Sequence, residues 1–405
     1  MKVALISFHS FVNPGGVKRH IFGLRKQLRK RKVNTKIIVP RRKLSEYYGR
    51  NIIILGTSFP IEFTGSQSDL PINFDAIAIE RVLRREKFDV LHFHNFGFPS
   101  ILQILLSLSA QNTVNVLTFH AGLKGNKYYE KFPNILYFLN KICQWKIDGI
   151  IGVAPLCLDY LKKYKGPKKV IPNGIDLDEF NTKVPKIKKF CDGKTNLLFV
   201  GRIEERKGLL YLLKAYKILQ KKFSDLRLII VGAGPLKKEC QQYVSKNKLK
   251  EVVFVGTINK TISRYYRTAD IFVSPSLFGE SFGLVLLEAM ACGTPVVAFG
   301  NQGYRGFLKG KAGERFLARP RDYRGLAKKT EILIKDPVLR KKVAAQGLKE
   351  ARPYSWEKVA NEVLDFYNLC KKEKRKKRTN GSSLEKILRK MATKDVREWI
   401  NESLK

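Results

Sequence analysis

Short aliphatic or β-branched runs alternate with longer helix-like segments over most of the 405 residues. Runs this apolar, alternating with helices, are typical of parallel sheets covered by helices on both faces. About twelve strands are too many for one doubly wound sheet, so the sequence predicts an α/β protein with two such domains. The predicted strands are 3–7, 35–39, 52–55, 90–92, 114–118, 149–153, 169–171, 197–200, 226–231, 252–255, 271–273 and 295–298.

A polar segment at 181–189 separates the two series of strands and helices. We therefore predict an N-terminal domain at 1–185 and a C-terminal domain at 186–355. A helical pattern follows at 356–371, and the run of cations at 371–378 indicates a basic linker. Residues 372–405 are expected to hold this linker and a terminal amphipathic helix.

The charge of the chain is strongly positive, with 78 Lys and Arg against 35 Asp and Glu, a formal net charge of +43. Nucleic acid, an anionic membrane surface or anionic substrates could each neutralise it, and a Lys-rich composition without any partner is the plain alternative. Zinc-finger, RNP-type and basic-zipper patterns are missing, which argues against nucleic-acid binding. No apolar run reaches the roughly 20 residues of a membrane span, and no secretory signal follows Met1.

Six cysteines stand singly, without a C-x-x-C pair or a histidine at ligand spacing. This pattern argues against disulfides and structural zinc and fits a reducing cytosol. His92 and His94 alternate at the end of a predicted strand. We interpret them as packing or cleft residues, and a metal site is the alternative.

Two glycine-containing turns each lie between a predicted strand and a helix. Gly15 and Gly16 precede the first helix, where a backbone without side chains lets a ligand approach and free N–H groups attract an anion. Gly201 to Gly208 follows the first strand of the second series and carries Arg202, Arg206 and Lys207. Cations at a strand end beside a helix N-terminus suit a diphosphate, although a solvated turn would look the same.

The segment 274–295, SPSLFGESFGLVLLEAMACGTP, is the most informative part of the chain. Glu280 lies in a loop before a helix, and Glu288 lies two turns into that otherwise apolar helix. A carboxylate in such a place must find hydrogen-bond donors or a polar ligand. Sugar hydroxyls are suitable donors.

These motifs together resemble the retaining glycosyltransferases of family 4, which have the GT-B fold. The resemblance rests on Glu280-x7-Glu288, on GR-x4-KG at 201–208, on IPNGID at 171–176 and on the early PGGV, in the expected order up to about residue 371. It implies two Rossmann-like doubly wound domains facing across a cleft, with the helix at 356–371 crossing back to the first domain. SFVNPGGVKRH, LTFHAG and GESFGLVLLEAM are most similar to the phosphatidylinositol mannosyltransferases and related lipid glycosyltransferases.

Carried over by position, the resemblance implies a role for each motif. The expected catalytic residues are His120, Arg202, Lys207 and Glu280, and the expected acceptor site is His9, Gly15, Lys18 and His120. The nucleotide sugar is expected to contact Gly16, Arg202, Arg206, Lys207, Thr257, Ile258, Asn259, Glu280, Ser281, Phe282, Gly283, Leu284 and Glu288.

The implied chemistry needs neither a cofactor nor a metal ion, because Arg and Lys neutralise the leaving diphosphate. The leaving phosphate itself would take the proton of the acceptor. The expected enzyme transfers a hexose to a lipid acceptor such as phosphatidylinositol. Mannose is favoured over glucose as the hexose, and the implied donor is GDP-mannose. The alternatives are a soluble family 4 enzyme of polysaccharide or glycoside synthesis and, from another class, a nucleic-acid-binding protein.

Three basic clusters could bring such an enzyme to the cytoplasmic face of an anionic membrane. The helix at 17–32 carries eight cations and no acid, 124–138 interleaves aromatic residues with lysines, and 371–378 is the linker run. Core packing of the aromatic residues and a merely solvated linker are the alternatives.

Overall fold

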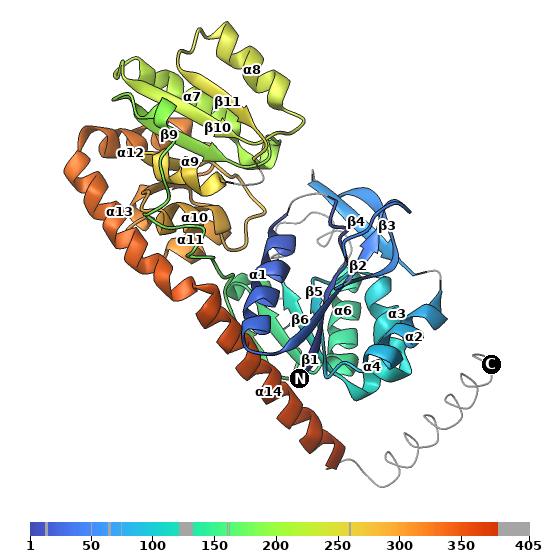
Figure 1. Cartoon of the computed structure of the whole chain (residues 1–405). Coiled ribbons are helices and arrows are strands. Elements are labelled where there is room, and N and C mark those ends of the chain that lie inside the picture. Colours follow the sequence, from blue (N-terminus) through green and yellow to red (C-terminus); the bar gives the residue numbers. More distant parts are fainter. Residues whose placement is uncertain are drawn as a thin grey trace.

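The computed structural model describes residues 1–12, 15–49, 51–63, 66–73, 75–120, 133–159, 161, 163–258 and 261–379. They form two α/β domains, each with a sheet covered by helices, joined at the side by one long helix (Figure 1). The first sheet ends at Val170 and the second begins at Thr195, so the boundary expected at 185 lies between them.

The N-terminal sheet has eight strands in the order β4-β3-β2-β1-β5-β6-β7-β8. All neighbours are parallel except β3 and β4. The strands are β1 (Lys2–Ser7), β2 (Asn34–Arg41), β3 (Ile52–Phe63), β4 (Ser66–Ile72), β5 (Val90–His94), β6 (Val114–Phe119), β7 (Gly149–Gly152) and β8 (Lys168–Val170). Its helices are α1 (Gly16–Lys30), α2 (Ala76–Glu86), α3 (Ser100–Leu106), α4 (Leu108–Asn112) and α6 (Pro133–Lys146).

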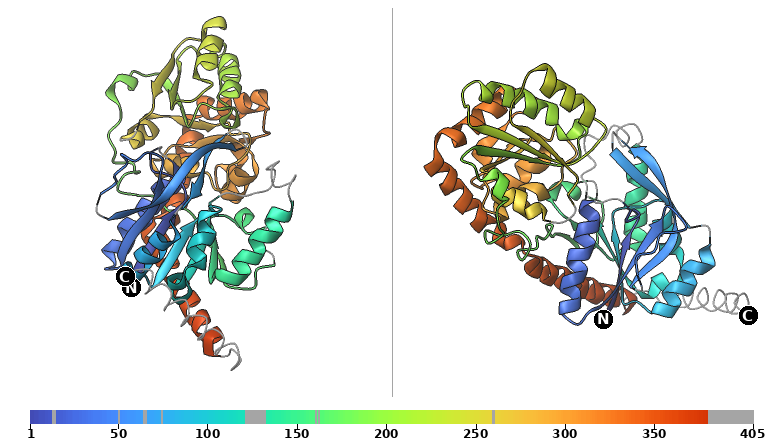
Figure 2. Two further views of the ribbon diagram at one scale, coloured as in Figure 1. Left: turned by 90° about the vertical axis from the view of Figure 1, so that its right-hand side faces the viewer. Right: turned by 45° about the horizontal axis from the view of Figure 1, so that its top comes forward.

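The C-terminal sheet is parallel throughout, in the order β11-β10-β9-β12-β13-β14. Its strands are β9 (Thr195–Val200), β10 (Leu226–Val231), β11 (Val252–Gly256), β12 (Ile271–Ser274), β13 (Val296–Phe299) and β14 (Leu317–Ala318). Its helices are α7 (Leu209–Gln220), α8 (Lys237–Lys246), α9 (Ile262–Thr268), α10 (Leu284–Ala291), α11 (Gln302–Leu308), α12 (Tyr323–Lys335) and α13 (Pro337–Ala351). The right view of Figure 2 shows helices on both faces of this sheet.

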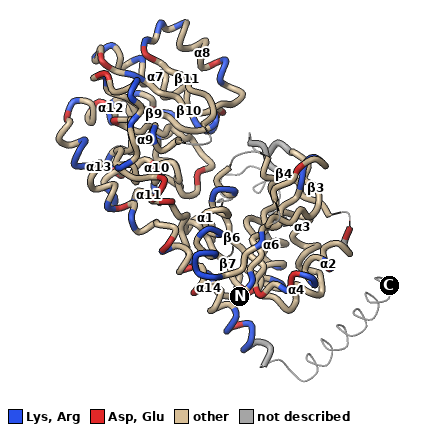
Figure 3. The backbone as a smooth tube through the Cα atoms, in the orientation of Figure 1, with Lys and Arg blue, Asp and Glu red and all other residues tan. Residues whose placement is uncertain are grey.

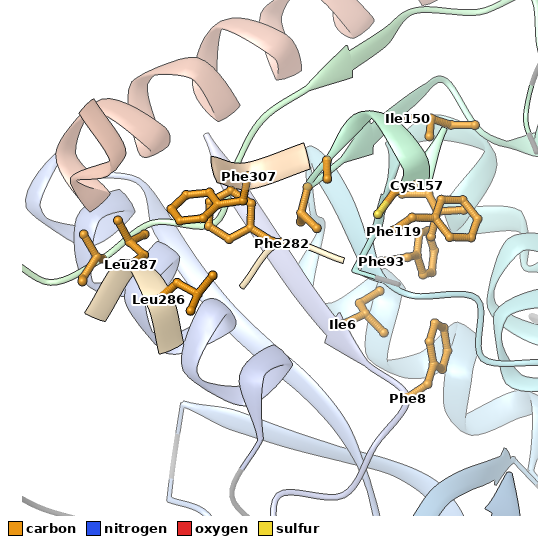
Figure 4. Packing of buried hydrophobic residues seen from close by; sticks show 14 of the residues in the cluster. Ile6, Phe8, Phe93, Phe119, Ile150, Cys157, Phe282, Leu286, Leu287 and Phe307 are labelled. Carbon is orange, nitrogen blue, oxygen red and sulfur yellow. The ribbon is translucent and has the colours of Figure 1, made fainter. Parts of the chain in front are cut away.

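Buried apolar residues connect the two domains. One cluster contains Phe93 and Phe119 of the N-terminal domain and also Phe282 and Phe307 of the C-terminal domain (Figure 4). The two domains therefore share a packed apolar interior.

Helix α14 (Trp356–Thr379) returns to the N-terminal domain, as the resemblance implied. Its Trp356 ring lies between Gly23 and Gly174, where an added Cβ would come within 2.3 Å of ring atoms in both cases. Val363, Phe366 and other apolar residues of α14 are buried in the same cluster as Val3 and Ile21. The long helix is thus part of the N-terminal core.

The expected end of this helix at 371 is wrong, because α14 continues to Thr379. The start of the expected linker is helical instead. Lys374 Nζ lies 2.7 Å from Asp148 Oδ2 and 2.6 Å from the carbonyl oxygen of Thr113, which fastens this turn to the domain. The terminal helix expected after it lies outside the described residues.

The sequence pattern did not reveal a hairpin at the sheet edge. β3 continues from the expected 52–55 to Phe63, and β4 pairs with it in antiparallel register. Pro60 and Pro71 interrupt the apolar pattern. Proline is tolerated because Pro71 lies on the edge strand β4 and Pro60 lies beyond Thr57, the last residue of β3 that pairs with β2. The two-residue strand β14 was missed as well.

Candidate active site

The expected site residues follow strands at which the strand order reverses. β1 lies between β2 and β5, and β9 lies between β10 and β12. Ligands of parallel α/β sheets bind at the carboxyl ends of such strands. Gly15 and Gly16 come after β1, Arg202 after β9 and Glu280 after β12.

A tight turn sets the basic loop after β9 against the loop after β12. Gly208 has φ +67°, and a Cβ added there would lie 2.2 Å from the carbonyl oxygen of Pro275. Across the same contact, the N–H of Leu277 donates to the carbonyl oxygen of Arg206 at 2.8 Å. The turn thereby brings the cations to Glu280.

Glu280 is the centre of a charged cluster. Its Oε1 lies 2.5 Å from Lys207 Nζ and 3.4 Å from Arg206 Nη1, and it accepts from Ser276 Oγ at 3.2 Å. Burial alone would raise the pKa of Glu280, but Lys207 and Arg206 outweigh it and hold the pKa below its usual value. Glu280 is therefore an anion with acceptor capacity left over.

Glu204 holds the remaining cation of the motif. This nearly buried carboxylate accepts from Arg206 Nε at 2.9 Å and lies 3.5 Å from Arg202 Nε. The Arg202 side chain is about half exposed, and Glu204 links it to Arg206 and so to the cluster around Glu280.

The backbone just before α10 packs against Tyr304 of α11. Gly283 caps α10 with φ +95°, and a Cβ there would lie 3.0 Å from the Tyr304 ring. Tyr304 in turn shares a hydrogen bond of 2.8 Å with Ser274. Within the expected sugar-binding stretch, Glu280, Ser281, Phe282, Gly283 and Leu284, the backbone at Gly283 is thus packed against Tyr304.

Glu288 is occupied from both sides in this structure. It is 2% exposed, its Oε1 lies 2.5 Å from Arg19 Nη1, and its Oε2 accepts from the hydroxyl of Tyr266 at 2.8 Å. Arg19 belongs to α1 of the other domain. The expectation that this carboxylate must find donors is met by Arg19 and Tyr266, which the sequence pattern did not reveal, and its contact with a ribose stays a prediction.

Four histidines, His20, His92, His94 and His120, lie together in the N-terminal domain. His94 Nδ1 lies 3.0 Å from His120 Nε2, and His20 Nδ1 lies 2.9 Å from Asn173 Oδ1. His92 bonds Tyr367 and Thr118, both at 2.6 Å, and is a packing residue as expected. Burial lowers the pKa of His20 to about 4 and of His92 to about 3, and that of the other two well below the usual value.

His20, His94 and His120 also bring ring nitrogens within 4.8 Å of one another. In the part of the chain that is described, this is a spacing from which a metal ion could be held. His94 and His120 already share a hydrogen bond, and so do His20 and Asn173.

The other expected residues lie further out. Lys18 Nζ donates to the carbonyl oxygen of Phe11 at 2.6 Å and so connects α1 with this residue after β1. A Cβ on Gly15 or Gly16 would meet open space. His9 follows β1 in the same loop. Thr257 and Ile258 come after β11, Ile258 packs on the core, and Asn259 lies outside the described residues.

Of the basic helix expected to face a membrane, several cations have internal partners. Arg19 bonds Glu288, Lys26 Nζ lies 2.7 Å from Asp176 Oδ2, and Arg31 Nε donates to Asn361 of α14 at 2.7 Å. One face of α1, with Ile21, Leu24 and Leu28, is buried against the sheet and α14, whereas Arg29 and Lys30 are exposed to solvent. Among the described residues, no helix has the length and apolar character needed to cross a bilayer.

Comparison with known proteins identifies families and relatives that this sequence resembles. The family model of glycosyltransferase family 4 matches residues 14–179, and that of glycosyl transferases group 1 matches residues 180–350. The phosphatidyl-myo-inositol mannosyltransferase of Mycobacterium leprae is 31% identical over 377 residues, covering 91% of this chain and 96% of that protein.

Solved structures agree on the fold. Sucrose-phosphate synthase from Thermosynechococcus elongatus superposes with a TM-score of 0.71 at 20% identity, over 91% of this chain and 98% of that one. Anabaena HepE, solved with UDP and glucose, gives 0.68 at 18% identity, over 89% and 98%. The chain therefore belongs to the family 4 glycosyltransferases of GT-B fold and is a glycosyltransferase enzyme.

Proposed function

We propose that the protein transfers mannose from GDP-mannose to a membrane lipid, phosphatidylinositol or a related glycolipid, with retention of anomeric configuration. The observation that carries the proposal is the cluster of Glu280 with Lys207 and Arg206 at the strand-order reversal of the C-terminal sheet. The relatives named phosphatidyl-myo-inositol mannosyltransferase support the choice of sugar and acceptor.

The cluster suits a reaction in which a diphosphate leaves. Lys207 and Arg202 would neutralise the charge that develops on the leaving oxygen, so the chemistry calls for no metal ion. Glu280 would accept hydrogen bonds from donor-sugar hydroxyls, and His120, neutral at pH 7, would contact the transferred sugar from the opposite domain. The leaving phosphate would take the acceptor proton on the same face of the sugar, which gives retention.

A panel of nucleotide sugars, offered with phosphatidylinositol in detergent or in anionic vesicles, tests donor and acceptor together. We expect a mannosylated lipid in which the anomeric configuration of the donor is retained. The one-bond coupling between C1 and H1 of the mannose, measured by NMR, reports this configuration. An inverted product would overturn the mechanism. Transfer only to water-soluble acceptors would favour the soluble enzyme of the same family.

Variants test the site itself. Glu280→Gln keeps the size of the side chain and removes its charge, and we expect transfer to fall about 100-fold or more. Glu331→Gln is the matched control. Glu331, on α12, has nearly the same exposure, 14% against 13%, and pairs with Lys335 of the same helix and with Lys222, which follows α7. Equal activity in the two variants would contradict the proposed role of Glu280.

A further inference from the structure

Helix α6 has an outer face unlike that of an ordinary surface helix. Tyr137, Phe138 and Trp145 are 57%, 48% and 63% exposed. At 100° per residue, they and Lys141 fall within about 100° of one another around the helix. Leu139, Ile142 and Cys143 take the opposite face and are buried in the core, so the aromatic face is not needed for folding.

Cations accompany these aromatic rings. Lys146 Nζ lies 4.2 Å from the centre of the Trp145 ring, and Lys141 Nζ lies 5.5 Å from that of Tyr137. The helix contains no acidic residue. Phe98, 50% exposed, lies just before α3 with its ring 6.3 Å from that of Phe138, and this extends the surface beyond the helix.

We propose that this surface, formed by Phe98, Tyr137, Phe138, Lys141 and Trp145, docks on an anionic phospholipid membrane. Tryptophan and tyrosine rings beside lysines suit the headgroup layer, where the rings lie among acyl carbons and the ammonium groups meet phosphates. A chain with net charge +43 is attracted to such a surface and not to a basic protein. The inference rests on the proposed lipid acceptor and identifies which side of the enzyme meets the bilayer.

The position of α6 fits this role. A helix that links two parallel strands starts at the carboxyl edge of the sheet, so the Tyr137 end of α6 lies at the edge where His120 follows β6. The left view of Figure 2 shows α6, in teal green, along the outside of the N-terminal domain. A membrane beneath this face would lie beside the N-terminal half of the cleft.

Vesicle binding tests the surface directly. We would compare sedimentation of the full chain with vesicles of phosphatidylcholine alone and with phosphatidylglycerol added. We expect binding to the anionic vesicles, weakened tenfold or more by Tyr137→Ser, Phe138→Ser and Trp145→Ser together. The control is Ile332→Ser, Val338→Ser and Leu369→Ser, which removes three apolar residues exposed on other helices.

A spectroscopic arm places the membrane at α6 itself. The chain has three tryptophans, so a Trp399→Phe background leaves Trp145, which is 63% exposed, and Trp356, which is 7% exposed. Quenching of the Trp145 fluorescence by brominated phospholipid supports the proposal. Three results would each overturn it. They are equal vesicle binding by the two triple variants, no vesicle binding by the wild type, and an α6 variant that loses self-association of the chain but keeps vesicle binding.

The test also separates this inference from the proposed function. Transfer to detergent-dispersed phosphatidylinositol needs no bilayer, so we expect the α6 variant to keep that activity. A chain that binds vesicles through α6 but transfers no sugar would refute only the proposed function. A chain that mannosylates the dispersed lipid but ignores vesicles would refute only the docking surface.

Discussion

The ion pair between Arg19 and Glu288 links the two domains and gives a quantitative prediction. Arg19→Gln removes the guanidinium from a carboxylate that is 2% exposed and leaves it only the hydroxyl of Tyr266. The Arg19 side chain is 51% exposed, so solvent screens part of the attraction.

The expected magnitude lies between two limits. Breaking a fully buried pair costs about 3–5 kcal/mol, and an exposed pair contributes about 0–1 kcal/mol. With one partner buried and the other half exposed, we expect Arg19→Gln to lower the free energy of unfolding by about 2 kcal/mol. For domains of this size the midpoint would fall by about 4–8 °C.

A double-mutant cycle isolates the interaction. Thermal unfolding of Arg19→Gln, Glu288→Gln and the double variant should give a coupling energy of about 1–2 kcal/mol. Lys26→Gln and Asp176→Asn form the control cycle, because both partners of that pair are exposed enough for the coupling to stay below about 0.5 kcal/mol. A coupling no larger than the control would refute the view that this pair holds the domains together.

Two further predictions concern the frame of the site. Gly208→Ala places a side chain at φ +67° and a Cβ 2.2 Å from the carbonyl oxygen of Pro275, so we expect a loss of about 2 kcal/mol or more in thermal unfolding. Gly306→Ala, whose Cβ meets open space, should show no such loss. Because buried His20 and His92 have pKa values of about 4 and 3, below the unfolded value, they bind protons on unfolding. Stability should therefore fall as the pH drops below about 6.5, by about 2 kcal/mol per histidine at pH 5, and a flat profile in urea would contradict this.

Most strands were predictable because buried strands consist mainly of apolar residues. β1 and β10 are buried at nearly every position, so they read as continuous apolar runs in the sequence. β3 and β4 at the edge need no such run, and their pairing depends on the neighbouring strand. The end of α14 was missed because Lys374 is held by Asp148, a partner 226 residues away.

The site residues, too, were predictable where a local motif contains them and not where distant packing selects them. Glu280, Arg206 and Lys207 stood out because each lies in a local motif at a strand end, and the structure brings them together. Arg19 could not be found in this way. It is one of many cations in α1, and only the packing of the two domains selects it for Glu288.

The net charge is therefore a poor guide to the membrane-binding surface when cations are simply counted. Figure 3 shows basic residues on both domains and along α1 and α14. Yet Arg19, Lys26 and Lys374 have carboxylate partners within the protein. What distinguishes α6 is the combination of Lys141 with exposed aromatic rings on one helix face that carries no acid. A polar helix face needs no apolar ligand, whereas exposed tryptophan and phenylalanine lose contact with water only when something covers them. The aromatic residues, and not the excess of lysine, single out α6 as the proposed membrane-binding side of the enzyme.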